Sequence, residues 1–240
     1  MKKKLIRKLT EYKIFQMETD KKLINDIKVE IVYDKNKRIY KNPNLNLNII
    51  YDKKFIDSYD TKVIYKILEK NIIYESKEDS QILIKGKLVN PSRKYVSYGD
   101  IKDPTTTKIR SWHENKPVEK IMKHLVEKLY KYCGIRFNFV LVNRYNDGND
   151  YIGYHSDRET DSAIAGISLG AKRSMYFQYA NQNKIMKLLK KPETLDIELE
   201  NGSLIMISPE TNKNWKHSIP KSKIIRHTRI SLTFRIIDLD

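Results

Sequence analysis

The chain has 240 residues, and its 47 Lys and Arg residues against 30 Asp and Glu residues give a formal net charge of +17. This length suits one sizeable mainly β or mixed domain, with or without a tail. The excess of cations favours a nucleic acid as partner, although a Lys-, Ile-, Asn- and Tyr-heavy composition also follows from an AT-rich genome. A single cysteine, Cys133, excludes an intramolecular disulfide and a thiolate metal site, so any metal must be held by His and carboxylate.

The sequence contains no candidate membrane segment. No stretch reaches the roughly eighteen apolar residues of a membrane span, and the Lys-rich start is not followed by the apolar run of a signal peptide. We therefore expect a soluble, intracellular monomer without membrane contact. Short basic clusters such as Lys2-Lys3-Lys4 do not decide between nucleus and cytoplasm.

The first 45 residues have the composition of a basic extension. They hold 12 Lys and Arg before Lys41 against six acids, contain no Gly and end near the turn Asn42-Pro43-Asn44. Their Leu and Ile content indicates that they pack on another part of the protein. We predict an N-terminal extension over residues 1–45 and a single domain over residues 46–240.

Two helices are predicted before the first long strand. The first begins at Asp57 or Ser58, and the second begins at Pro117 and ends at Gly134. Their apolar residues recur at helical spacing: Val63, Ile64, Ile67 and Leu68 in the first, and Val118, Ile121, Met122, Leu125 and Leu129 in the second. We expect both helices to buttress a sheet.

After Gly134 the apolar period changes to two, which is typical of strands. Short β-rich runs follow the stretch around 137–142, at 163–169, 174–178, 195–199 and 203–207. The dipeptide Asn201-Gly202 predicts a hairpin between the last two runs. The final run alternates cleanly, with Arg229, Ser231, Thr233 and Arg235 on one face and Ile230, Leu232, Phe234 and Ile236 on the other. Many short strands with turn signals indicate a jelly-roll or barrel rather than a parallel sheet.

The triplet His155-Ser156-Asp157 is a candidate metal site, because side chains two apart on a strand project to the same side. A third ligand far along the chain completes two histidines and one carboxylate, a set that leaves three positions on one side of Fe(II) open. His217 is the natural candidate. By itself a His-x-Asp triplet is common by chance, so the rest of the sequence must support it.

Two further groups supply that support. Arg229 and Arg235 lie about 20 Å apart along one strand face at 3.3 Å per residue, and Asn143 and Tyr145 extend the apolar face of the strand that begins near residue 137. A dicarboxylate cosubstrate needs a guanidinium at its distal end with amide and phenol donors nearby. The alternatives are a solvated sheet face for the arginines and an amphipathic rim residue for Tyr145.

Taken together, these motifs resemble those of the AlkB-type Fe(II)- and 2-oxoglutarate-dependent dioxygenases, closest to the animal homologues that repair DNA. Residues 143–157 resemble the family's run from the 2-oxoglutarate-binding Asn-x-Tyr to the iron-binding His-x-Asp. Three later motifs keep the family's order and spacing: GSLIM at 202–206, WKHSIP at 215–220 and RISLTFR at 229–235. Weaker similarity reaches back to about residue 50, and the first 45 residues lie outside it.

The resemblance implies a mixed α+β, mainly β fold, with a double-stranded β-helix (jelly-roll) core, buttressing N-terminal helices and a dioxygenase domain at 46–240. It implies Fe(II), 2-oxoglutarate and O₂ as cofactor and cosubstrates. The implied iron ligands are His155, Asp157 and His217. The implied 2-oxoglutarate contacts are Asn143, Tyr145, Arg229, Ser231 and Arg235, with Arg229 at the distal carboxylate. The implied substrate contacts are Lys85, Arg93 and Glu159, although Glu159 also fits a surface residue beside Arg158.

The activity that the resemblance implies is oxidative demethylation of N-alkylated bases in DNA or RNA. Hydroxylation of the alkyl group is coupled to decarboxylation of 2-oxoglutarate, and formaldehyde is released. A base in a duplex must first be flipped out.

Two departures from the repair homologues put the substrate in doubt. Lys85 stands at the tip of the segment 84–87, where the duplex-repair homologue inserts an aromatic wedge. Residues 103–107 lack the aromatics that sandwich the base. We therefore expect a preference for single strands, and we keep two alternatives: a same-fold oxygenase acting on protein or RNA, and a non-catalytic, basic nucleic-acid-binding module.

Overall fold

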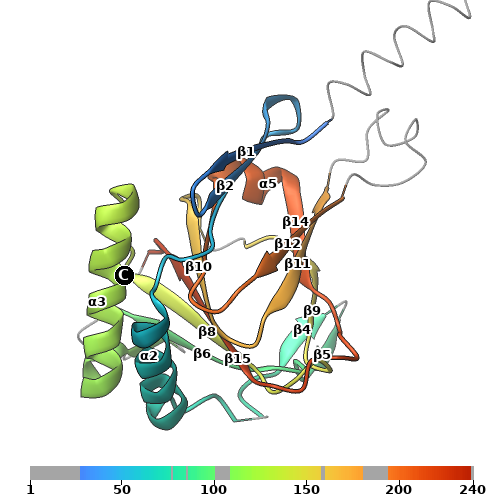
Figure 1. Cartoon of the computed structure of the whole chain (residues 1–240). Helices are drawn as coiled ribbons and strands as arrows, with labels where there is room; N and C mark the ends of the chain where they lie inside the picture. The colour runs from blue at the N-terminus through green and yellow to red at the C-terminus, as the bar shows by residue number, and fades with distance from the viewer. Residues whose placement is uncertain are drawn as a thin grey trace, which may run out of the picture.

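The computed structural model of the chain describes residues 28–76, 78–84, 86–100, 109–157, 160–180 and 194–238. These residues build two facing sheets with two helices against the outer side of the larger sheet (Figure 1). The larger sheet has nine strands in the order β1-β2-β3-β13-β10-β15-β8-β6-β7, and the smaller has four in the order β12-β11-β14-β9. This arrangement confirms the predicted mainly β fold with a jelly-roll core and buttressing helices.

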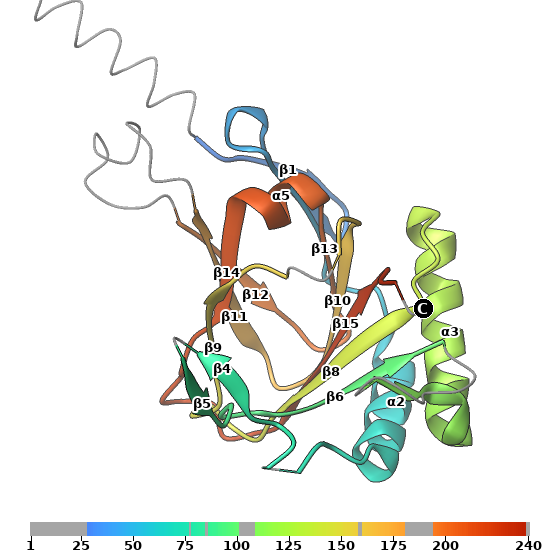
Figure 2. The same cartoon turned by 180° about the vertical axis from the view of Figure 1, so that it is seen from behind.

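The strands of the larger sheet are β1 (Glu30–Asp34), β2 (Lys37–Asn42), β3 (Leu47–Asp52), β6 (Lys94–Gly99), β7 (Ile109–Ser111), β8 (Phe139–Tyr145), β10 (Ile164–Gly170), β13 (Leu204–Ile207) and β15 (Arg229–Arg235). Those of the smaller sheet are β9 (Ile152–His155), β11 (Arg173–Tyr179), β12 (Thr194–Leu199) and β14 (Trp215–Ile219). A separate hairpin, β4 (Ile82–Ile84) with β5 (Lys87–Val89), lies beside β9 in both views (Figures 1 and 2). Short helical turns are η1 (Pro43–Leu45), η2 (Trp112–Glu114) and α5 (Pro209–Asn214).

Both predicted helices are confirmed. Helix α2 (Ser58–Asn71) begins after Asp57, whose side chain accepts hydrogen bonds from two backbone N–H groups of the first turn. Helix α3 (Lys116–Cys133) ends at Gly134, which adopts the left-handed conformation at φ 72°. Their apolar faces pack on the outer side of the nine-stranded sheet, where they form one of the two cores.

Strands β8 and β15 are buried on both faces because a core lies on each side of the larger sheet. Val142 and Leu232 point into the helix-side core, and Tyr145 belongs to the second core, between the two sheets. The antiparallel register places Arg229 opposite Tyr145 and Ser231 opposite Asn143. The polar face of the last strand therefore points into the space between the sheets.

The hairpin predicted at Asn201-Gly202 is wrong. Strand β12 pairs with β11 in the smaller sheet, whereas β13 pairs with β10 and β3 in the larger one. The turn carries the chain from one sheet to the other. Its polar groups bond to β10, since the Gly202 N–H donates to the Ser168 carbonyl and Asn201 Oδ1 accepts from the Gly170 N–H. Gly202 also sits at φ 82°, and a Cβ there would lie 2.7 Å from the Ile56 carbonyl oxygen.

Two strands fall within the predicted extension. Strand β1 pairs with β2 and β2 pairs with β3, so both lie at one edge of the larger sheet. Tyr40 of β2 is buried between the sheets, which agrees with the expectation that this segment packs on the protein. The predicted boundary between an N-terminal extension (1–45) and the domain (46–240) remains a prediction. Among the helices of the described residues, none combines the length and the apolar character needed to cross a membrane.

Candidate active site

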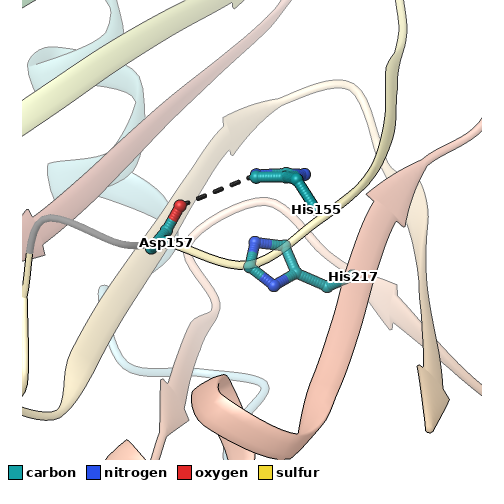
Figure 3. A group of neighbouring side chains, drawn as sticks. All are labelled: His155, Asp157 and His217. Carbon is teal, nitrogen blue, oxygen red and sulfur yellow. Dashed lines mark ion pairs between the residues drawn. The ribbon is translucent and has the colours of Figure 1, made fainter. Parts of the chain in front are cut away.

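The predicted metal ligands meet at one point between the sheets (Figure 3). His155 ends β9 and Asp157 follows two residues later. His217, on the neighbouring strand β14, is paired directly with His155 in the sheet register. One ligand atom from each of the three side chains lies within 4.8 Å of the other two. The structure therefore brings together the two-histidine, one-carboxylate group that the sequence predicted.

Both histidines are held in the neutral form, in which an imidazole nitrogen can donate a lone pair to a metal. Burial lowers the pKa of His155, partly opposed by Asp157, and burial lowers the pKa of His217 to about 3, reinforced by His155. The Nδ1 atom of His155 lies 2.9 Å from the Gly153 carbonyl oxygen. Since that carbonyl can only accept, Nδ1 carries the proton and Nε2 keeps its lone pair for a metal.

Asp157 is buried and held from two sides. Its Oδ1 atom lies 2.8 Å from Nη2 of Arg235 and 3.6 Å from Nε2 of His155. Its backbone N–H donates to Oδ1 of Asn212 at 3.0 Å, and its carbonyl accepts from Nδ2 of the same amide at 2.6 Å. The carboxylate is therefore directed by contacts to both its side chain and its peptide.

A cavity between the sheets contains the metal group and continues toward Arg229. Its lining includes every residue predicted for the metal and the cosubstrate: Asn143, Tyr145, His155, Asp157, His217, Arg229, Ser231 and Arg235. Apolar side chains complete the walls: Leu141, Ile152, Ile164, Met175, Leu199, Ile205, Ile207 and Ile219. Such a lining excludes water and strengthens electrostatic interactions with a charged ligand.

Some of the hydrogen-bond donors of Arg229 have no partner among the described residues. It is 2% exposed, and its Nη2 donates to the hydroxyls of Ser168 and Ser231 at 2.9 and 3.2 Å. Within the described part of the chain, its Nε and Nη1 have no hydrogen-bond partner. Burial lowers the pKa of Arg229 to about 10, which still leaves it charged at neutral pH. A buried cation with unmet donors fits an anionic ligand, and the alternative of a solvated arginine face is excluded.

Arg93, predicted to contact substrate, lies beside the cosubstrate group. Its Nε donates to Oδ1 of Asn143 at 2.7 Å. Lys85 and Glu159, the other predicted substrate contacts, lie outside the described residues. His113 is not part of the cavity lining and bonds to Asp100 and Glu119 instead.

Sequence reasoning missed three residues that support the site: Ser168, Arg173 and Asn212. Ser168 continues the cavity-facing alternation of β10, a signal that was present in the sequence. Arg173 is the first residue of β11 and lies one residue before the predicted run at 174–178, and Asn212 lies in a six-residue helix. For these two, no local pattern indicates which distant groups they contact.

The jelly-roll fold and its two-histidine, one-carboxylate group define the class of the protein. It belongs to the 2OG-Fe(II) oxygenase superfamily, whose family model matches residues 76–235. The enzyme accordingly depends on Fe(II), 2-oxoglutarate and O₂. The donor set suits iron, and the unmet donors of Arg229 suit a carboxylate.

Comparison with its relatives shows that, within this superfamily, the chain is an AlkB-type enzyme. The chain is 34% identical to the mouse protein named DNA oxidative demethylase ALKBH2, over 72% of this chain and 74% of that one. It is 33% identical to the human protein of the same name, over 72% and 67%. It is 30% identical to human alkB homolog 3, named an alpha-ketoglutarate-dependent dioxygenase, over 52% and 43%. A solved structure described as OsALKBH1 has a TM-score of 0.48 and 17% identity, covering 78% of this chain and 97% of that chain.

Proposed function

We propose that this protein oxidatively removes small alkyl groups from the bases of nucleic acid. The observation that carries the proposal is the metal group in one cavity with the buried cation Arg229. It occurs in a chain that is 34% identical, over 72% of its length, to a protein named a DNA oxidative demethylase. The +17 charge suits a phosphate backbone. Methyl groups on N1 of adenine and N3 of cytosine are the adducts that we expect it to remove.

The iron ligands in this proposal are His155, Asp157 and His217. Three protein ligands on one side of the ion leave the other side for cosubstrates. When bound, the iron with 2-oxoglutarate and O₂ supplies the oxidant that hydroxylates the alkyl group. Burial keeps both histidines neutral, and Arg235 holds the carboxylate of Asp157 in one orientation.

The cosubstrate is held by the polar face of β15 and the end of β8. Arg229 takes the distal carboxylate through its unmet donors, with Tyr145 and Ser231 beside it. Asn143 lies nearer the metal group and is directed by Arg93. The apolar walls exclude water from this recess, so the ion pair with the carboxylate is strong.

For the nucleic acid we propose a preference for single strands. Flipping a paired base costs a few kcal/mol, which a protein recovers by filling the gap and stacking the extruded base. Lys85 cannot fill a gap in the stack, and Thr105, Thr106 and Thr107 offer no stacking face. Lys85 and the three threonines lie outside the described residues, so this part of the proposal depends on sequence alone. A monomer is sufficient, since one chain supplies the whole site.

The test is to incubate the iron-loaded enzyme with methylated DNA and RNA oligonucleotides and to analyse the digested products by mass spectrometry. We expect loss of methyl groups matched by succinate. Succinate without any change in the bases would support the oxygenase and reject the substrate. It would favour the alternative of an oxygenase acting on protein. Loss of methyl groups from RNA alone would reject DNA as the target.

A further inference from the structure

Arg173, the first residue of β11, is a buried cation that forms no direct ion pair with any carboxylate of the described residues. It is 3% exposed and donates three hydrogen bonds, all to backbone carbonyls: to Asp147 at 3.0 Å, to Asp150 at 2.9 Å and to Pro220 at 2.6 Å. The two nearby carboxylates accept hydrogen bonds from other residues. That of Asp150 accepts from Asn146 and that of Asp147 from Asn149. Burial of a charged guanidinium in this way raises the free energy of the folded protein unless the charge interacts favourably with another charged or polar group.

The ring of Tyr145 lies close to two guanidinium groups. The centre of the Arg173 guanidinium is 5.5 Å from the ring centroid, and that of Arg229 is 5.2 Å from it. The two cations come from facing sheets, Arg173 from the smaller and Arg229 from the larger. Tyr145 and Arg229 line the cavity, whereas Arg173 is not part of its lining. Both distances are within the range of cation–π contacts, so Arg173 also holds the ring in place.

We propose that Arg173 is a positioning residue for the distal carboxylate of 2-oxoglutarate, acting through Tyr145. Its charge raises the positive potential at the end of the cavity that Arg229 forms, and its contact with the ring keeps the phenol there. The other cation of the site, Arg235, is paired with Asp157 and adds less to this end. The inference rests on the proposed 2-oxoglutarate site and adds a cation that does not touch the ligand.

A purely structural role is the competing explanation. The three carbonyls tie β11 to the chain just before β9 and just after β14, the strands that carry His155 and His217. If Arg173 only joins these segments, its loss disturbs the whole site, including the metal. If its charge acts on the distal carboxylate, its loss affects ligands that have this carboxylate more than ligands that lack it.

The experiment compares two ligands of the Mn(II)-loaded, full-length protein under nitrogen by titration calorimetry. One is 2-oxoglutarate. The other is 2-oxopentanoate, which has the same 2-oxo acid and a methyl group in place of the distal carboxylate. The variants are Arg173→Met and Arg173→Lys. The matched control is Lys172→Met, which removes the same charge one residue away, where Lys172 is exposed and paired with Glu198.

For Arg173→Met we expect the affinity for 2-oxoglutarate to fall roughly tenfold and that for 2-oxopentanoate to change less than about threefold. Arg173→Lys, which keeps the charge, should retain more of the affinity. Lys172→Met should leave both affinities unchanged. An equal fall for both ligands in Arg173→Met, or no fall for either, would overturn the inference.

A second measurement keeps Arg173 in place in case its variants do not fold. In Arg229→Met the protein should still prefer 2-oxoglutarate over 2-oxopentanoate, by about threefold or more, because Arg173 remains. Complete loss of this preference would assign the effect to Arg229 alone and overturn the inference. Failure of the unaltered protein to bind 2-oxoglutarate would overturn both this inference and the cosubstrate assignment. Binding without dealkylation would contradict only the proposed substrate.

Discussion

Asn212 and Asp157 lie 55 residues apart in the chain, yet one side-chain amide of Asn212 bonds to both backbone polar groups of Asp157. Both residues are buried. The helix that carries Asn212 is itself anchored, since the Thr211 hydroxyl accepts from the Asn48 N–H at 2.7 Å. The position of the carboxylate beside the two histidines therefore depends on an amide outside the metal group.

Asn212→Ala should weaken iron binding. It leaves the buried N–H and carbonyl of Asp157 without partners, and loss of an outer contact of this kind typically lowers metal affinity about 10- to 100-fold. The measurement is the dissociation constant for Fe(II) or Mn(II) in the absence of 2-oxoglutarate. Asn214→Ala is the matched control, because this half-buried amide on the same helix donates to the Glu210 carbonyl rather than to Asp157. Equal metal affinities for the two variants would contradict the role of Asn212.

Removing any one metal ligand should abolish turnover. We expect His155→Ala, Asp157→Ala and His217→Ala each to produce no succinate above background, because the open site needs all three ligands. Circular dichroism should show that the fold persists. His124→Ala, at an exposed position on α3, should keep full activity. Full activity in His217→Ala would remove this residue from the site.

Arg229→Ala should weaken the binding of 2-oxoglutarate. The change removes a charge-assisted pair worth about 1.5–3 kcal/mol, so the apparent affinity should fall roughly ten- to a hundredfold or more. The Michaelis constant for 2-oxoglutarate at saturating iron measures this. Arg226→Ala, which removes an equal charge from an exposed loop residue, should leave the constant unchanged. An unchanged constant in Arg229→Ala would contradict the assignment.

The stability of the metal-free protein should fall as the pH drops below about 6.5. His217, with its pKa lowered from 6.5 to about 3, stays neutral in the folded protein, while the unfolded chain takes up a proton near pH 6.5. The unfolded state thus binds more protons between about pH 6.5 and 3, and the free energy of unfolding falls by about 1.4 kcal/mol per pH unit in this window. Above the window His217 adds no pH dependence.

Urea unfolding of chelator-treated protein at about pH 7 and about pH 5 measures this slope. His217→Gln should reduce the slope by close to one proton, and the exposed His124→Gln should not. Equal slopes in the unaltered protein and His217→Gln would show that His217 is protonated at the same pH in both states.

Single strands should be demethylated faster than duplexes, and the rate should fall as salt rises. The salt dependence follows from the release of counterions when cationic side chains contact phosphates. Single-turnover rates on one methylated sequence, single-stranded and annealed, give the comparison. Lys85→Phe supplies an aromatic residue in the sequence between β4 and β5 and should raise the duplex rate selectively. Equal or faster repair of the duplex by the unaltered protein would contradict the argument from Lys85.

The parts of the site that depend on local backbone geometry were predictable from the sequence. A strand places side chains two apart on one side, so His155 and Asp157 were identified as neighbours from their spacing. The same alternation assigned Arg229 and Ser231 to one face of the last strand. Asp57 and Gly134 marked helix ends because capping depends on a few adjacent peptide groups.

Which of these faces is buried, and which residues each face contacts, follows from the packing of the two sheets and could not be read from the alternation. Alternation alone left Arg229 equally suited to solvent, and the second sheet, which covers it, is built from distant segments. The predicted hairpin at Gly202 failed for the same reason. The turn closes on itself through the Ser203 N–H and the Glu200 carbonyl, but its other bonds to β10 lead the chain into the larger sheet. The contacts of Asn212 with Asp157 and of Arg173 with Tyr145 cross from one element to another. Such contacts depend on how the sheets pack, and packing is set by the whole core rather than by the period of any one strand.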